Sequence, residues 1–172
     1  GLYMNINKFT QKSLQAVQDC EKMAYDYGHQ ELVPEHLLYS LLTTEDSLIA
    51  KLFEKMEISP EVFLAQLNGL LNKRPKVSGG QVYVGNDLNK VLIYAEDEAK
   101  HMGDSYVSVE HLFLSLLKNC GRDLKELFKN FRIDKERFLK VLAEVRGNQK
   151  VTTDNPEATY DTLAKYGQEL VE

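Results

Sequence analysis

The chain has 172 residues, of which 43% are hydrophobic and 27% are charged, and its formal net charge is −5. These values exclude collagen-like, disordered and disulfide-scaffold proteins. No apolar run is long enough for a membrane-spanning helix or for a secretory signal peptide, so we expect a cytoplasmic protein without a membrane partner. We also expect no nucleic-acid partner, because the chain lacks the Lys/Arg excess that phosphate contacts need.

An internal repeat organises the sequence. Aligned against itself at an offset of 75 positions, the chain matches without a gap over about 9–71 and about 84–146. Most of the shared positions are apolar and recur at helical spacing, so the repeat indicates one packing scheme used twice. We therefore predict an all-α domain over residues 4–146, built as a tandem pseudo-twofold repeat of two four-helix motifs.

The ends of the predicted helices carry recognisable capping residues. Gly28 and Gly103 follow the first helix of each half, where a left-handed C-terminal cap is expected. The first-half helices are predicted at about 14–27, from Pro34, at 49–55 and from Pro60; those of the second half are predicted at about 88–102, after Ser108, at 124–130 and from Lys135. No segment favours a sheet, and residues 81–84 are interpreted as an extended connector between the halves.

The two ends of the chain differ in character from this domain. Residues 1–3 precede Met4 and resemble a cloning remnant. From Gly147 the sequence is polar and unpatterned, so residues 147–155 are predicted to form a linker. Residues 156–172 are then expected to be a helical tail with a thin apolar stripe, which leads to an ATPase domain missing from this sequence.

A search for catalytic and metal-binding motifs gives no candidate. The phosphate-binding loop, the dinucleotide fingerprint, the zinc-protease motif and the nucleophile elbow are all absent from the sequence. We therefore expect no catalytic residue, no metal site and no cofactor in this segment. Cys20 and Cys120 have no CxxC motif or His pair beside them, which favours buried free thiols over a metal site or a disulfide.

The positions of the four histidines indicate a role in packing or helix capping rather than in metal binding or catalysis. His29 and His101 lie near turns, whereas His36 and His111 are repeat equivalents in the first turns of helices. A zinc site would need converging partners that this spacing does not supply.

Glu35 and Glu110 are also repeat equivalents in first turns, and two interpretations of them stay open. A carboxylate there is stabilised by the helix dipole, by about 0.3 to 1 kcal/mol. Alternatively, the carboxylates lie at the mouth of a groove and recognise a cationic or hydrogen-bond-donating part of a partner, together with Thr10 and Asp104. Periodicity does not separate the two.

The run Leu92-Ile93-Tyr94 lies on the first helix of the second half. Three consecutive residues of a helix cannot all face one core, so at least one is expected at the surface or at the seam between the halves. An apolar groove at that seam would suit contact with extended or unfolded chains, although each residue alone is also suited to core packing.

Several of these motifs together resemble the Clp N-terminal repeat domain, and in particular its ClpB branch. The resemblance runs from about residue 4 to residue 172 and rests on Phe9-Thr10, Pro34–Leu38, Val82–Leu92, Gly103–Ser108, Val109–Phe113 and Asn155–Tyr160. It implies a non-catalytic module of a hexameric AAA+ ATPase, a disaggregase that works with the DnaK system. The module would capture unfolded or aggregated polypeptide for threading through the ring.

The resemblance also implies substrate-binding residues. The family's polar contact positions fall on Thr10, Asp104 and Glu110, and its apolar groove positions fall on Leu92 and on His111, where some relatives carry leucine.

A related branch, the ClpC N-terminal domain, offers the alternative of adaptor or phosphoarginine recognition. It uses a threonine and a glutamate in each half, and Thr10 with Glu35 would form the first such pocket. In the second half Gly85 stands at the threonine position beside Glu110, so a hydroxyl is missing. This departure disfavours a two-site phosphoarginine reader.

Overall fold

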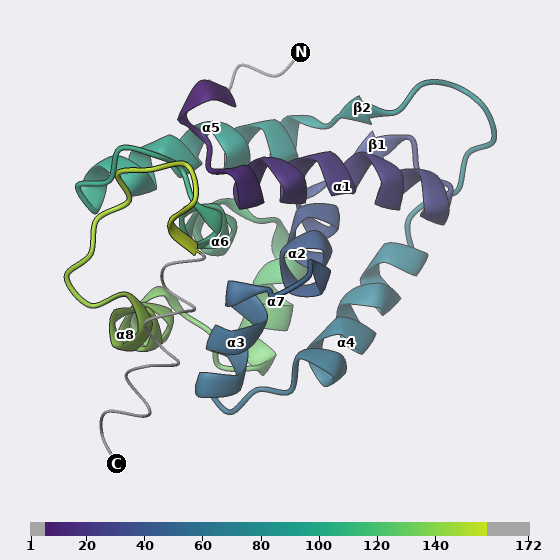
Figure 1. Cartoon of the computed structure of the whole chain (residues 1–172). Coiled ribbons are helices and arrows are strands. Elements are labelled where there is room, and N and C mark those ends of the chain that lie inside the picture. Colours follow the sequence, from purple (N-terminus) through teal and green to yellow (C-terminus); the bar gives the residue numbers. More distant parts are fainter. Residues whose placement is uncertain (1–5, 158–172) are drawn as a thin grey trace.

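The computed structural model describes residues 6–157 of the chain (Figure 1). Residues 1–5 and 158–172 are outside this part, and with them the predicted remnant 1–3 and nearly all of the predicted tail. A short 3-10 helix, Ile6–Lys8, comes first. The first half then forms α1 (Gln11–Tyr27), α2 (Pro34–Thr43), α3 (Leu48–Lys55) and α4 (Pro60–Asn72), and the second forms α5 (Asn86–His101), α6 (Val109–Asn119), α7 (Arg122–Asn130) and α8 (Lys135–Arg146).

This order confirms the predicted pair of four-helix motifs. Gly28 ends α1 at φ 74°, a left-handed conformation that costs glycine little, and Gly103 follows α5 at φ 71°. Ser59 accepts a hydrogen bond from the Val62 N–H at the start of α4, and Ser108 is the N-cap of α6. In the described part of the chain, no helix is long and apolar enough to cross a membrane.

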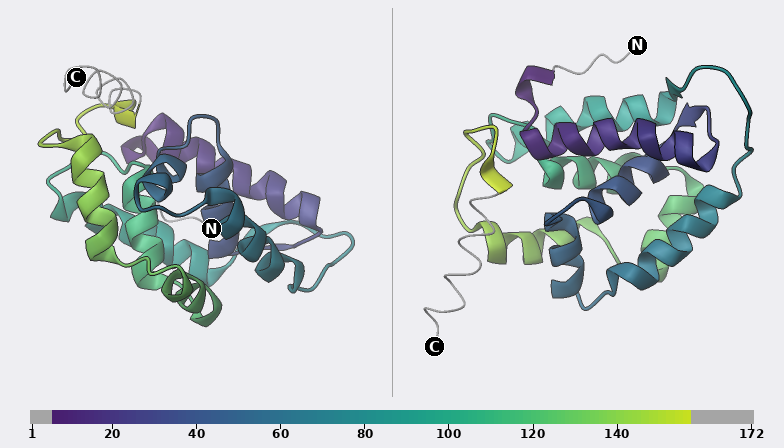
Figure 2. Two further views of the ribbon diagram at one scale, coloured as in Figure 1. Left: turned by 90° about the horizontal axis from the view of Figure 1, so that it is seen from below. Right: turned by 45° about the vertical axis from the view of Figure 1, so that its right-hand side comes forward.

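Two extended segments are exchanged between the halves. β1 (Glu31–Leu32) pairs in parallel with β2 (Tyr83–Val84), so the expectation that no sheet forms was wrong. Phe9 makes the equivalent parallel bridge to Val107, 75 positions after Leu32. An extended segment of each half thus pairs with one of the other half. This pairing supplies hydrogen-bond partners for the backbone groups of both segments. The connector after α4 runs outside the helices before it reaches β2 (Figure 2).

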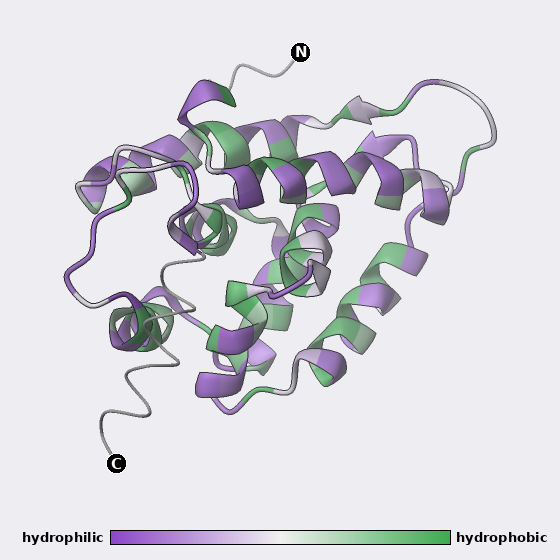
Figure 3. Ribbon diagram, in the orientation of Figure 1, coloured by the Kyte–Doolittle hydropathy of each residue, from purple (hydrophilic) through white to green (hydrophobic). Residues whose placement is uncertain are grey.

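The core lies between the halves and is rich in phenylalanine. Phe53 and Phe113 pack edge to face with ring centroids 5.7 Å apart, and Phe63 stacks on Phe128 at 6.1 Å. Each pair joins one half to the other, and such pairs add roughly 0.5 to 1.5 kcal/mol beyond area burial. Hydrophobic helix faces turn inward and polar faces outward (Figure 3).

The two cysteines confirm the prediction of buried free thiols. Burial, the main cause, raises the pKa of the Cys20 thiol and raises that of Cys120 to about 11.

Residues 147–157, here called the return segment, pack against the domain instead of leaving it as a linker (Figure 1). Val151 is fully buried, and its carbonyl accepts a hydrogen bond from the Ser105 N–H at 2.8 Å. Further along, the Asp154 carbonyl accepts from the Gln11 N–H at 2.8 Å. The stretch predicted as a linker, 147–155, is therefore bonded to both α1 and the turn after α5.

Candidate functional site

Four of the five predicted substrate-binding residues meet in one place, around the N-termini of α1 and α6. Thr10 is the N-cap of α1, Glu110 and His111 lie in the first turn of α6, and Asp104 lies in the turn before it. All four side chains are buried. With Arg146 and Glu157 they form a group of buried polar side chains that we call the polar cluster.

Arg146 and Asp104 form the centre of the polar cluster. The Asp104 carboxylate contacts Nε2 of His111 at 2.7 Å, is paired with the Arg146 guanidinium, and accepts a hydrogen bond from the Val151 N–H at 2.9 Å. Burial by itself would raise the pKa of Asp104, but these hydrogen bonds outweigh burial and hold the pKa below its ordinary value. Arg146 also reaches Glu110 at 3.4 Å, so one cation serves two buried carboxylates.

Glu157 closes the polar cluster from the return segment. Its Oε2 atom accepts hydrogen bonds from the Thr10 hydroxyl at 2.8 Å and from the Val109 N–H at 3.2 Å. Burial and then the nearby Glu110 charge raise the pKa of Glu157 to about 6. The sequence does not mark this residue, because a glutamate after a polar stretch carries no periodic signal.

The prediction of helix capping is confirmed for His36 and His111. His111 Nδ1 accepts a hydrogen bond from the Ser108 N–H at 2.9 Å, and His36 Nδ1 accepts from the Val33 N–H at 3.0 Å. Both rings therefore cap the helix that carries them. No cluster of three or more metal-binding side chains occurs within residues 6–157.

The fifth predicted residue, Leu92, does not reach the surface. Its side chain is fully buried, whereas its neighbours Ile93 and Tyr94 are 38% and 43% exposed. The expectation that at least one residue of this run faces outward is confirmed, but the choice of Leu92 as a groove contact is corrected: it belongs to the core.

Glu35, the predicted second pocket, faces a cation of its own chain. Arg74 lies 3.8 Å from Glu35 and 3.8 Å from Glu31. The Glu31 side chain occupies the space that a Cβ at position 85 would need, so a larger residue there must displace it. Burial, the main cause, raises the pKa of Glu35. These contacts leave the carboxylate engaged inside the protein.

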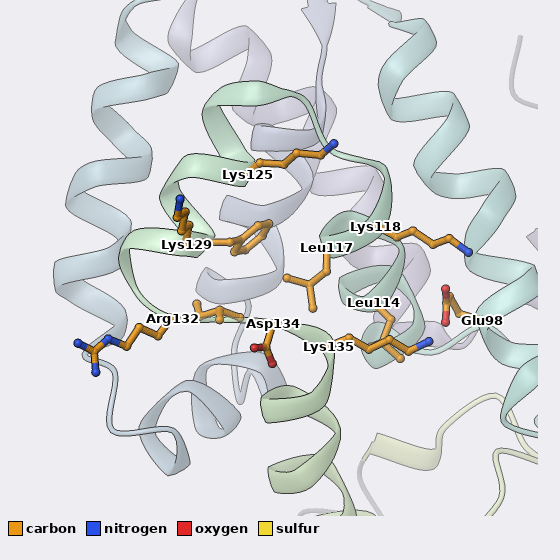
Figure 4. Close-up of a pocket in the computed structure, with 11 residues that line it drawn as sticks. Glu98, Leu114, Leu117, Lys118, Lys125, Lys129, Arg132, Asp134 and Lys135 are labelled. Carbon is orange, nitrogen blue, oxygen red and sulfur yellow. The ribbon is translucent and has the colours of Figure 1, made fainter.

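A cleft of about 710 Å³ opens elsewhere, between α6, α7 and the start of α8 (Figure 4). Apolar side chains form its floor, namely Leu114, Leu117, Phe128 and Ile133. Basic side chains surround them, namely Lys118, Lys125, Lys129, Arg132 and Lys135, and the acidic residues Glu98 and Asp134 complete the lining. We call this site the basic-rimmed cleft. The sequence does not reveal this cleft, because exposed lysines on helices resemble any solvated face.

Comparison with known sequences places these features in a family. The family model described as the Clp repeat (R) N-terminal domain matches residues 8–131. The chaperone protein ClpB of Nitratidesulfovibrio vulgaris is 43% identical over 175 residues, and that of Clostridium tetani is 42% identical over 174. Each alignment covers 98% of this chain but only 20% of the relative, so the chain spans about a fifth of the length of these relatives.

Solved structures share the fold. The Hsp104 N-terminal domain from Candida albicans superposes with a TM-score of 0.76 at 21% identity, covering 87% of this chain and 99% of that domain. A ClpV N-domain, solved in complex with a VipB peptide, gives a TM-score of 0.65 at 20% identity, covering 80% of this chain and 86% of that one. At these identities the likeness concerns the fold alone.

Proposed function

Because the chain belongs to the Clp repeat (R) N-terminal domain family, we propose that it is the substrate-binding N-terminal domain of a ClpB-type, ATP-dependent disaggregase. In this proposal the domain performs no catalysis and needs no cofactor of its own. It captures unfolded or aggregated polypeptide in the cytoplasm, and the hexameric ring of the parent protein threads that polypeptide with the help of the DnaK system. Sequence identity of about 40% to ClpB chaperones over 98% of the chain supports this assignment.

The basic-rimmed cleft is the observation that carries the proposal. Its apolar floor lies between α6, α7 and the start of α8, and exposed side chains border it. Apolar contacts are non-directional, so such a floor accepts leucine, phenylalanine or methionine from many sequences. The solved complex of a ClpV N-domain with a VipB peptide shows that another domain of this fold binds a peptide.

Weak, reversible capture follows from the size of the floor. Burying one large apolar side chain contributes roughly 1.5 to 3 kcal/mol, and ordering the bound segment offsets part of it. A domain that releases its substrate to a ring needs this modest affinity.

The polar cluster has a conditional place in this proposal. Substrate contact by Thr10, Asp104 and Glu110 requires a route to their side chains, and Val151 and Glu157 of the return segment occupy that route. We therefore propose that these residues contact substrate only after the return segment has moved away. Leu92 lies beneath the surface and has no part in such contact.

The test is a titration of the isotope-labelled domain with a soluble, permanently unfolded polypeptide, followed through backbone amide shifts. We expect shifts at Leu117, Phe128 and Ile133, which line the cleft. Absence of shifts across the whole domain would contradict polypeptide capture.

A parallel titration with free phosphoarginine tests the ClpC-type alternative. Shifts confined to Thr10 and Glu35, with none from the unfolded polypeptide, would move the domain to the adaptor- or phosphoarginine-recognition class.

A further inference from the structure

The charged side chains at the rim of the cleft indicate which polypeptide segments bind there. This inference rests on the proposed function. Five of the seven charged side chains that line the cleft are cations, although the whole chain carries a net charge of −5. We propose that the basic-rimmed cleft selects polypeptide segments in which acidic residues flank large apolar side chains. The apolar side chains would enter the floor, and the carboxylates would meet the rim.

The internal repeat supplies a control for this argument. The floor residues have apolar or aromatic equivalents 75 positions earlier, in the order Tyr39, Leu42, Phe53 and Ile58. The rim does not, because its five cations correspond to Thr43, Ala50, Glu54, Glu57 and Pro60. The apolar or aromatic character of these positions is therefore shared by both halves, whereas the basic charge belongs to the second half alone. Packing does not demand that charge.

Interaction with the helix dipole explains the positions of only some of the rim cations. Lys118 and Lys129 lie in the last turns of α6 and α7, where a cation interacts favourably with the helix dipole. Lys135 is the first residue of α8, where the dipole disfavours a cation. The helix dipole therefore does not account for the cation at Lys135.

The acidic residues of the lining leave the rim basic. Asp134 is the N-cap of α8 and accepts a hydrogen bond from the Arg137 N–H at 2.8 Å, so its carboxylate already serves the helix. Glu98 comes from α5 and is buried, on the side of Lys118 (Figure 4). The cations of the rim, among them Lys125, Lys129 and Arg132, are exposed to solvent around the mouth of the cleft.

Exposed ion pairs are individually weak and salt-dependent, which sets the size of the expected effect. Two or three such pairs predict an affinity about tenfold higher for an acidic segment than for a neutral one at low salt. Raising the salt concentration should reduce this ratio, because the rim charges are exposed to solvent.

The test compares three soluble peptides with the same apolar centre, flanked by glutamate, glutamine or lysine, titrated into the labelled domain. Amide shifts at Leu117, Phe128 and Ile133 report occupancy of the cleft. We expect the glutamate peptide to bind about tenfold more tightly than the glutamine peptide at low salt, and the lysine peptide to bind most weakly. Equal affinity of the three peptides would overturn the charge preference and leave polypeptide capture standing. Failure of all three to shift these amides would contradict capture at this cleft.

A charge-reversal variant locates the effect. The double change Lys129→Glu with Arg132→Glu copies the residues of the first half, where Glu57 holds the same left-handed backbone at φ 61° as Arg132 does at φ 57°. We expect this variant to lose the preference for the glutamate peptide and to keep its affinity for the glutamine peptide.

The matched control is Lys22→Glu with Lys140→Glu, two exposed lysines outside the cleft. Equal loss of preference in the two double variants would show only a general effect of net charge and would overturn the proposal. Thermal melts of both proteins check that each is folded.

Discussion

The Thr10 hydroxyl donates a hydrogen bond to Glu157 at 2.8 Å, across 147 positions of sequence. The same carboxylate accepts the Val109 N–H, so one side chain of the return segment links the starts of α1 and α6. Both helix N-termini carry donors that need acceptors, and a buried carboxylate supplies them at the cost of its own desolvation.

This arrangement predicts a pH-dependent attachment of the return segment. The raised pKa of Glu157, about 6 against 4.5, means that its protonated form is favoured in the folded state. The stability that protonated Glu157 contributes is therefore fully present below about pH 4.5 and is lost as the pH rises through about 6. Above pH 6, Glu157→Gln should therefore raise the free energy of opening at the Val151 amide by up to about 2 kcal/mol, which slows its hydrogen exchange. Near pH 4.5 the same change should have little effect on exchange.

Exposed Glu21→Gln is the matched control and should leave exchange at Val151 unchanged at both pH values. Faster exchange in Glu157→Gln at pH 7.5 would show the reverse, that the ionised carboxylate holds the segment.

Arg146 is predicted to be the residue whose loss costs most in the polar cluster. Arg146→Met removes the cation that faces both Asp104 and Glu110 and leaves two buried carboxylates without it. We expect the free energy of unfolding to fall by about 3 to 5 kcal/mol at pH 7, measured by urea denaturation. Lys140→Met, at an exposed position of the same helix, should change it by less than about 0.5 kcal/mol.

Addition of Asp104→Asn to the Arg146→Met variant distinguishes charge from packing. The second change removes one of the uncompensated charges, so part of the lost stability should return. Further loss in the double variant would indicate that the arginine acts mainly by filling space.

Much of the fold could be predicted because helix signals are local. The caps at Ser59 and Ser108 and the ring hydrogen bonds of His36 and His111 depend on residues within a turn of one another, and the repeat displays each pattern twice. Periodicity also showed that Leu92-Ile93-Tyr94 must reach the surface somewhere. It could not fix which residue, since that depends on the rotation of α5 against α6.

The return segment and the cleft could not be predicted for a different reason. Val151 is one apolar residue in a polar stretch, so no pattern marks it, yet its own N–H and carbonyl pair with Asp104 and Ser105 in the turn after α5. The basic-rimmed cleft joins Lys118, Lys125 and Lys135 from three elements. Only the way the helices pack brings these side chains around one floor.

The histidine pair of the first half predicts a loss of stability in acid. Nδ1 of His29 lies 2.9 Å from Nε2 of His36, where the second half has Asp104 and His111. Burial and then His29 lower the pKa of His36 to about 3. The unfolded chain takes up this proton near pH 6.5, so stability should fall as the pH drops from about 6.5 toward 3. His29→Asp, which copies the second half, should raise the pKa of His36 in an NMR titration and reduce the fall in unfolding free energy between pH 7 and 4.5.

The control for this pair is His101→Asp at an exposed position, which should leave the titration of His36 unchanged. An unchanged pKa of His36 in His29→Asp would show that burial alone sets it.

Gly85 and Glu31 are predicted to be energetically coupled. Gly85 has an ordinary φ of −69°, so what opposes a larger residue there is the Glu31 side chain beside it and not the backbone. Gly85→Thr should lower the free energy of unfolding by about 1 to 3 kcal/mol, since the new side chain must displace that carboxylate. In a Glu31→Ala background the same threonine can cap α5 as Thr10 caps α1, and the change should become neutral or stabilising by about 0.5 to 1 kcal/mol. Urea denaturation of the four proteins gives the coupling energy directly, and additive effects would show that the two positions act independently.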